Sequence, residues 1–309
     1  VRPEGEQMET CGDVWFGSLQ YSGNWRMDFE KYPQGEVQVT GGINFWDQSL
    51  TLNPQKSFTT PKIIIGYTQR GMEGVSQYLA SYTREKVLHS SHREKVRPVL
   101  YNSWYATTFD VNEEHQLALA KIAKDLGVEI FVIDDGWFKG RVNDKSGLGD
   151  WIVDKNKFPN GLQPMIEKIN AMGLDFGIWI EPEMVNPNSE LYRTHPDWVF
   201  HYPNRMRHEE RNQLMLNLAR EDVCQYLYES FSKLLRENNI KYIKWDMNKS
   251  LTDPGFPSAP PNVQRAVRIK YVKNLYRLLE KLRTEFPDVW FENCASGFGN
   301  DGSYRFLLG

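Results

Sequence analysis

The sequence predicts an α/β fold, a (β/α)8 TIM-type barrel that is incomplete at about five strands and follows an antiparallel β region. Three observations lead to this prediction. Short apolar runs alternate with amphipathic helical patterns after about residue 95, each apolar run ends in polar or aromatic residues, and alternating polar and apolar runs fill the segment before residue 82.

The first part of the chain has the period of two that is typical of β-strands. Residues 36–40, 58–60 and 62–67 alternate in this way between turns rich in Gly, Pro and Asn. A polar helical stretch over 72–85 then leads into 90–98, which has the composition of a linker. We therefore expect a domain boundary near residue 95.

The second part alternates between strand and helix. Strands are predicted over 99–104, 129–134, 175–181, 242–246 and 289–292, with helices over 113–126, 161–172, 221–237 and 263–285. Gly127, Gly173 and Pro287 end three of these helices.

The polar ends of the five strands favour a barrel, in which the active site lies at the carboxyl ends of the strands. A doubly wound sheet is the alternative, but it usually carries a Gly-rich phosphate loop, and no G-x-G-x-x-G run follows the first strand. A barrel needs eight strands, so five leave it incomplete.

Composition excludes several classes of function. A formal net charge of −3 offers no attraction to nucleic acid or an anionic membrane. No apolar run reaches the length of a membrane span, and the first residues are not a signal peptide. We therefore expect a cytoplasmic protein. The three cysteines are far apart in sequence, which predicts reduced thiols. No cofactor is expected.

The strand over 242–246 gives the strongest candidate site. Lys244, Asp246 and Asn248 share one face of an extended chain, so a cation, a carboxylate and an amide converge there. Asp246 is the candidate nucleophile, kept ionised by Lys244, and a structural ion pair of the two is the alternative.

Adjacent carboxylates follow another strand. Asp134 and Asp135 either bind sugar hydroxyls, hold a metal or cap a turn. A metal is the weaker choice, because neighbouring side chains of a strand point to opposite faces and no histidine lies near.

Further candidates come from other strand ends and from a loop. Trp104 and Trp179 would supply flat apolar faces for a sugar ring. Glu181 and Glu183 are plausible acids, but structural support is the better interpretation. Arg211 is by default an exposed cation, and Cys294 is better interpreted as a wall residue than as a nucleophile, because no histidine is near to activate it.

Five motifs in order resemble the α-galactosidases of glycoside hydrolase family 36 over about 97–296. They are Asn-Ser-Trp at 102–104, Ile-Asp-Asp-Gly-Trp at 133–137, Trp-Ile-Glu-Pro-Glu-Met-Val at 179–185, Lys-Trp-Asp-Met-Asn at 244–248 and Glu-Asn-Cys-Ala-Ser-Gly at 292–297.

The resemblance implies that residues 1–95 are the C-terminal part of an N-terminal β-sandwich domain plus a linker, and that 96–309 are the N-terminal portion of the catalytic barrel. It implies hydrolysis of terminal α-galactosyl residues of melibiose or raffinose type by a retaining double displacement, with Asp246 as nucleophile. A homo-oligomer is compatible with the family. The implied substrate-binding residues are Asp134, Asp135, Trp104, Trp179, Arg211, Lys244, Asn248, Cys294 and Gly297.

The sequence departs from the family at two places. After the cysteine the usual Gly-Gly-Gly-Arg run is interrupted at Phe298. The family's general acid/base is an aspartate of a Ser-Asp motif on the next strand, and no residue of this chain matches it. Galactosyl transfer to a sugar acceptor, as in raffinose synthase-like enzymes, and non-catalytic galactoside binding on a decayed barrel are the alternative functions.

Overall fold

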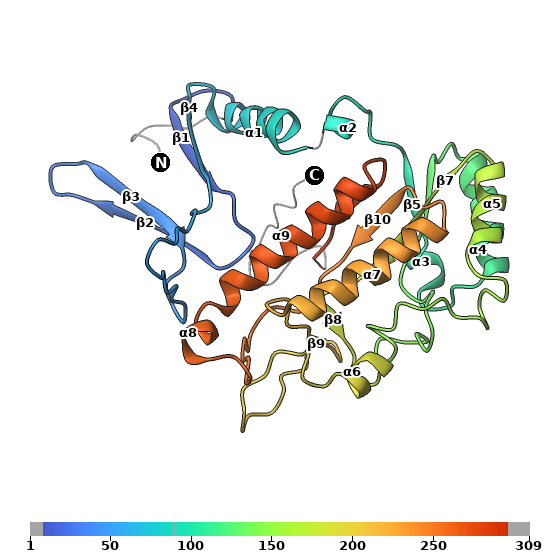
Figure 1. Ribbon diagram of the computed structural model, residues 1–309. Coiled ribbons are helices and arrows are strands. Elements are labelled where there is room, and N and C mark those ends of the chain that lie inside the picture. The colour runs from blue at the N-terminus through green and yellow to red at the C-terminus, as the bar shows by residue number, and fades with distance from the viewer. Residues whose placement is uncertain (1–8, 89, 296–309) are drawn as a thin grey trace. The chain divides into compact units, whose positions relative to one another are not determined.

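The computed structural model describes residues 9–88 and 90–295 (Figure 1). The chain divides between Glu94 and Lys95 into two compact units.

The described part of the first unit consists of two antiparallel sheets of two strands each, followed by helices. Strand β1 (Val14–Leu19) pairs with β4 (Ile63–Thr68), and β2 (Trp25–Lys31) pairs with β3 (Val37–Ile43). Helix α1 (Gly71–Tyr82) packs on β1 and β4 and runs on into the π-helical turn η1 (Thr83–Val87), and α2 (Ser90–Arg93) follows. The expected strand over 58–60 is wrong. This segment is coil, because Pro61 next to it has no N–H to give to a ladder.

The second unit is built on a five-stranded parallel sheet. Its strands are β5 (Leu100–Asn102), β6 (Ile130–Ile133), β7 (Asp175–Ile180), β10 (Tyr242–Trp245) and β11 (Trp290–Asn293). Each strand pairs with the next of these along the chain, so their order in space follows the sequence. This is the strand arrangement of a TIM-type barrel, with five of its eight strands among the described residues, as the sequence predicts.

Four long helices connect these strands, as expected from their apolar stripes. They are α4 (Glu113–Asp125), α5 (Gln163–Ala171), α7 (Glu221–Glu237) and α9 (Val267–Glu285). The Asn112 side chain caps α4 by accepting from His115 N, and Gly127 follows its end with φ at 80°. Helices α7 and α9 lie side by side along the sheet (Figure 1).

Four differences from the predicted elements affect the connections. The helix expected over 263–285 is divided into α8 (Pro261–Gln264) and α9 by the non-helical residues 265–266. Helices α3 (Trp104–Thr107) and α6 (Glu190–Thr194) were not expected. Neither was the antiparallel pairing of the short strands β8 (Met184–Val185) and β9 (Leu214–Met215).

The core of this unit lies between the sheet and its helices. Strand β6 is buried along its whole length and β7 from Phe176 onward, as in sheets that are covered on both faces. Gly177 lets three strands approach closely, since a Cβ there would lie 2.8 Å from Val132 Cγ2 and 2.9 Å from Tyr242 Cβ. Within the described residues, no helix is long and apolar enough to cross a membrane.

Candidate active site

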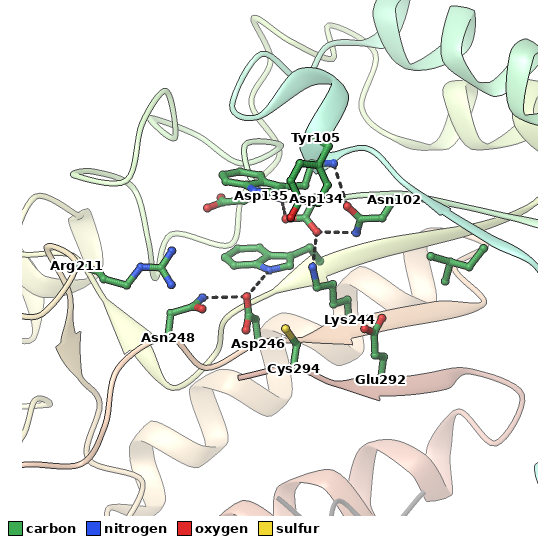
Figure 2. Close-up of a pocket in the computed structure, with 13 residues that line it drawn as sticks. Asn102, Tyr105, Asp134, Asp135, Arg211, Lys244, Asp246, Asn248, Glu292 and Cys294 are labelled. Carbon is green, nitrogen blue, oxygen red and sulfur yellow. Dashed lines mark hydrogen bonds and ion pairs between the residues drawn. The ribbon is translucent and has the colours of Figure 1, made fainter. Parts of the chain in front are cut away.

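A cavity of about 470 Å³ opens at the carboxyl ends of the five parallel strands (Figure 2). It brings together nine of the ten substrate-binding and catalytic residues expected from the sequence, and the tenth, Gly297, lies outside the described residues. The expected residues that line it are Trp104, Asp134, Asp135, Trp179, Arg211, Lys244, Asp246, Asn248 and Cys294. The lining also includes Leu100, Asn102, Tyr105 and Glu292.

Asp246 directly follows β10 and is 6 % exposed. Its Oδ2 accepts hydrogen bonds from Trp179 Nε1 at 3.0 Å and Asn248 Nδ2 at 2.8 Å. Its Oδ1 accepts from the backbone N of Met247 at 2.9 Å. The carboxylate is therefore oriented by neutral donors from two strand ends.

The structural ion pair of Lys244 with Asp246, which was the alternative interpretation from the sequence, is not formed. Lys244 Nζ lies 2.8 Å from Asp134 Oδ2, and Asn102 Nδ2 donates to the same oxygen at 2.6 Å. In Figure 2 both side chains converge on Asp134. Burial, the largest single influence, works to lower the pKa of Lys244. The charge and hydrogen bond of Asp134, together with the charges of Cys294 and Asp246, outweigh burial, so the pKa is raised and the ammonium stays charged.

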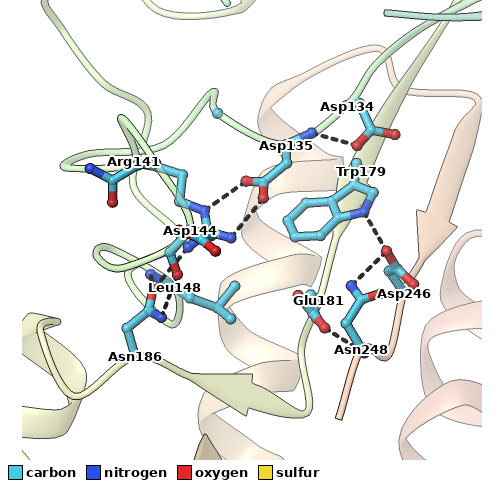
Figure 3. A network of polar contacts seen from close by, with 12 residues as sticks. Asp134, Asp135, Arg141, Asp144, Leu148, Trp179, Glu181, Asn186, Asp246 and Asn248 are labelled. Atoms are coloured by element: carbon cyan, nitrogen blue, oxygen red, sulfur yellow. Dashed lines mark hydrogen bonds and ion pairs between the residues drawn. The ribbon is translucent and has the colours of Figure 1, made fainter. Parts of the chain in front are cut away.

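Asp135 forms an ion pair with the buried side chain of Arg141, a residue that the sequence did not single out. Arg141 Nε and Nη2 donate to the two carboxylate oxygens at 2.8 and 2.7 Å (Figure 3). Arg141 is 2 % exposed, and its Nη1 donates to Asn186 Oδ1 at 2.9 Å. Burial raises the pKa of Asp135, and the two hydrogen bonds from Arg141 oppose this rise.

The two adjacent aspartates were expected on opposite faces, yet both line the cavity. Strand β6 ends at Ile133, so the alternation of a strand no longer applies to Asp134 and Asp135. Among the described residues, no group of three or more His, Cys, Asp or Glu side chains is arranged to hold a metal.

Two indole rings contribute to the wall. Trp104 is the first residue of α3, two residues after the last residue of β5, and its ring meets Phe109 edge-on with centroids 5.2 Å apart. Trp179 belongs to β7, is 2 % exposed and stacks on Phe138 with an angle of 3° between the rings. Both positions follow from the strand ends predicted from the sequence.

Arg211 comes from the long connection between β8 and β9. Arg211 and Asn212 have φ values of 52° and 58°, and the Glu210 and Gln213 backbones close a tight turn by two hydrogen bonds. Asn186 Nδ2 donates to the Asn212 carbonyl at 2.7 Å and fixes this turn. The turn brings Arg211 to the cavity, which the default interpretation as an ordinary exposed cation did not predict.

Cys294 follows β11 and has the environment of a wall residue. Burial, and then the negative charge of Asp246, raises the pKa of its thiol to about 11. A thiol with this pKa is protonated at pH 7, so the structure gives no support to a nucleophilic role.

The comparisons with known proteins agree with this geometry. Residues 57–304 match the melibiase family, and residues 3–53 match the N-terminal domain of glycosyl hydrolase family 36. The chain is 45% identical over 291 residues to α-galactosidase AgaA of Geobacillus stearothermophilus and 42% identical to α-galactosidase Mel36A of Lactobacillus acidophilus. In both cases the match covers 94% of this chain and 40% of the relative, so the chain spans well under half of their length.

The solved structures give the same relationship. The crystal structure of AgaA, a family 36 α-galactosidase, has a TM-score of 0.92 at 44% identity and covers 98% of this chain and 42% of that protein. Variants of AgaA have been solved in complex with stachyose and with raffinose, with TM-scores of 0.93 and 0.92. By the extent of the sequence match, the chain belongs to the melibiase family.

Proposed function

We propose that this protein is an α-galactosidase that releases terminal non-reducing α-D-galactosyl residues from oligosaccharides of melibiose and raffinose type. The observation that carries this proposal is the arrangement of Asp246, Asp134 and Lys244 around one cavity at the strand ends of a family member. The related structures with raffinose and stachyose support the substrate class.

Asp246 is the proposed nucleophile of a retaining double displacement. One carboxylate oxygen attacks the anomeric carbon, the glycosidic C–O bond breaks, and the leaving oxygen takes up a proton. Water then attacks the same carbon, which restores the carboxylate and releases galactose. The proton donor is assigned to no described residue.

The remaining cavity residues are proposed to bind the sugar. Asp134, with Lys244 beside it, and Asp135 accept hydrogen bonds from galactose hydroxyls, those around C4 and C6 by family resemblance. Trp104 and Trp179 offer apolar faces to the ring. Arg211, Asn248 and Cys294 complete the wall, together with Gly297 outside the described residues.

The test uses an aryl α-galactoside with a nitrophenolate leaving group, which departs without protonation. Asp246→Ala should lose at least about 1,000-fold in kcat, since the covalent step has no nucleophile. Added azide should then restore turnover and give β-galactosyl azide, because azide enters from the face that the carboxylate has left free. Asp125→Asn, an exposed change at the end of α4, is the matched control. Full activity of Asp246→Ala without azide would refute the assignment.

The same assay separates hydrolysis from the alternatives. Galactosyl transfer would appear as a new oligosaccharide when sucrose is added as acceptor, and a binding protein would bind galactose without turnover. The roles of the two units as an N-terminal domain and a catalytic domain, a cytoplasmic location and a homo-oligomeric state remain predictions from the sequence.

A further inference from the structure

Glu181 is a fully buried carboxyl group directly behind the cavity. It follows the last residue of β7 and is 0 % exposed. Its Oε1 accepts from the backbone N of Asn248 at 2.6 Å, and its Oε2 accepts from Gln213 Nε2 at 2.9 Å. Figure 3 shows Glu181 beside Asn248 and close to Asp246. Neither of these donors carries a charge.

The two hydrogen bonds reach both sides of the cavity. Asn248 Nδ2 holds the Asp246 carboxylate, so the bond to Asn248 N fixes the turn that presents the proposed nucleophile. Gln213 is 2 % exposed and lies two residues after Arg211, in the turn that brings Arg211 to the cavity. A single carboxyl group thus connects the turn after β10 to the loop before β9.

The charges around Glu181 disfavour its ionised form. Asp246 faces it from the end of β10, and Asp135 and Arg141 face it from the segment after β6, where Arg141 is already bound to Asp135. Burial first, and then the charges of Asp246 and Asp135, raises the pKa of Glu181 to about 8, against the opposing hydrogen bond from Asn248. An ionised Glu181 would add a further negative charge behind the nucleophile.

We propose that Glu181 is a positioning residue which, as a neutral carboxylic acid, fixes the 246–248 turn and the Arg211 loop in the geometry that the reaction needs. In this form Oε1 accepts from Asn248 N, and the hydroxyl on Oε2 donates to Gln213 Oε1, which the Gln213 amide presents when it is turned over. The proposal rests on the proposed function in so far as Asp246 is the nucleophile. It assigns Glu181 no contact with the substrate and no proton transfer to it.

Two substitutions distinguish the need for an uncharged side chain at position 181 from the need for its two hydrogen bonds. Glu181→Gln keeps an acceptor for Asn248 N and is uncharged at every pH. Its amide can donate to Gln213 Oε1, which has no hydrogen-bond partner among the described residues, once the Gln213 amide turns over. Glu181→Ala removes both bonds. Glu183→Gln is the matched control, since Glu183 is equally buried but is bound by Trp245 and Tyr271.

The kinetic test measures kcat and KM for a dinitrophenyl α-galactoside between pH 5 and 9. This leaving group needs no protonation, so a general acid does not produce the decline at high pH. At pH 6, Glu181→Gln should keep kcat/KM within about threefold of the wild type, and Glu181→Ala should lose about 100-fold, mainly in kcat, as a displacement of about 1 Å does. The wild type and Glu183→Gln should lose activity with a midpoint near pH 8, and Glu181→Gln should not.

The result that overturns the proposal is a Gln variant as impaired as the Ala variant, or an Ala variant as active as the wild type. Two measurements do not depend on turnover. At pH 6, the infrared difference spectrum between the wild type and Glu181→Gln should contain the carbonyl band of one buried carboxylic acid, and a crystal structure of Glu181→Ala should show the 246–248 turn displaced. A wild type without turnover would contradict the proposed function alone, and a missing band or an unmoved turn would contradict the role of Glu181.

Discussion

The stability of the protein should depend on pH through Glu181, and Glu181→Gln should remove this dependence. Burial raises the pKa of this group from an ordinary value of 4.5 to about 8 in the folded state. Below pH 4.5 the group is protonated in both the folded and the unfolded state, so the full stability is present. Between pH 4.5 and 8 only the unfolded state releases the proton, so stability falls as pH rises through this range.

The size of this change in stability follows from the interval between the pKa of Glu181 in the unfolded state and its pKa in the folded state. At about 1.4 kcal/mol per pH unit, the interval from 4.5 to 8 corresponds to about 5 kcal/mol of unfolding free energy lost by the wild type. Glu181→Gln carries no titrating group at this position and loses none of it. The free-energy difference between variant and wild type should therefore grow from pH 4.5 to 8 and then level off.

Urea unfolding of the two proteins, followed by tryptophan fluorescence at intervals of half a pH unit, measures this difference. Because the proteins differ at one position, other titrating groups cancel in the comparison. If the two stability curves run parallel from pH 4.5 to 9, Glu181 has the same proton affinity folded and unfolded, and the reasoning from its burial is refuted.

Three further predictions concern other residues. Arg141→Ala should lower the free energy of unfolding by about 3–5 kcal/mol, because it leaves the Asp135 carboxylate buried without its cation, and urea unfolding measures it. A loss below about 1 kcal/mol would contradict the stabilising role of the Arg141–Asp135 ion pair. Gly177→Ala should destabilise by about 1–3 kcal/mol, since the added Cβ meets Val132 and Tyr242 inside the sheet, and unchanged thermal unfolding would argue against that close packing. Cys294, with a pKa of about 11, should react with iodoacetamide about ten times faster for each pH unit between 7 and 10, as followed by mass spectrometry, and a rate that levels off near pH 8 would be inconsistent with its burial.

The sequence predicts the strand ends well because their signal is local. A short apolar run followed by polar residues marks the carboxyl end of a parallel strand, and the barrel brings all such ends to one side. This rule places Asp134, Lys244 and Asp246 in one site. The long helices also follow from local patterns, as the buried stripe of α7 shows.

The pairing of these residues could not be predicted, because it depends on contacts between distant segments. Lys244 and Asp134 are 110 residues apart, and their contact is set by the positions of β6 and β10 on either side of β7. Arg141 lies in an irregular segment without any periodic pattern. The position of Arg211 depends on the antiparallel pairing of β8 with β9, whose strands of two residues each are too short to leave a recognisable alternation.

The pairing also distinguishes Asp246 from the other aspartates of the cavity. The charge of Asp134 is balanced by contact with Lys244, and that of Asp135 by contact with Arg141. Asp246 is instead held by the neutral donors of Trp179, Asn248 and Met247, which orient its oxygens without cancelling its charge. A carboxylate that is fixed in direction but keeps its negative charge is suited to attack a carbon that becomes positive in the transition state. A neutral Glu181 behind it preserves this arrangement, because it places no second negative charge beside the Asp246 carboxylate.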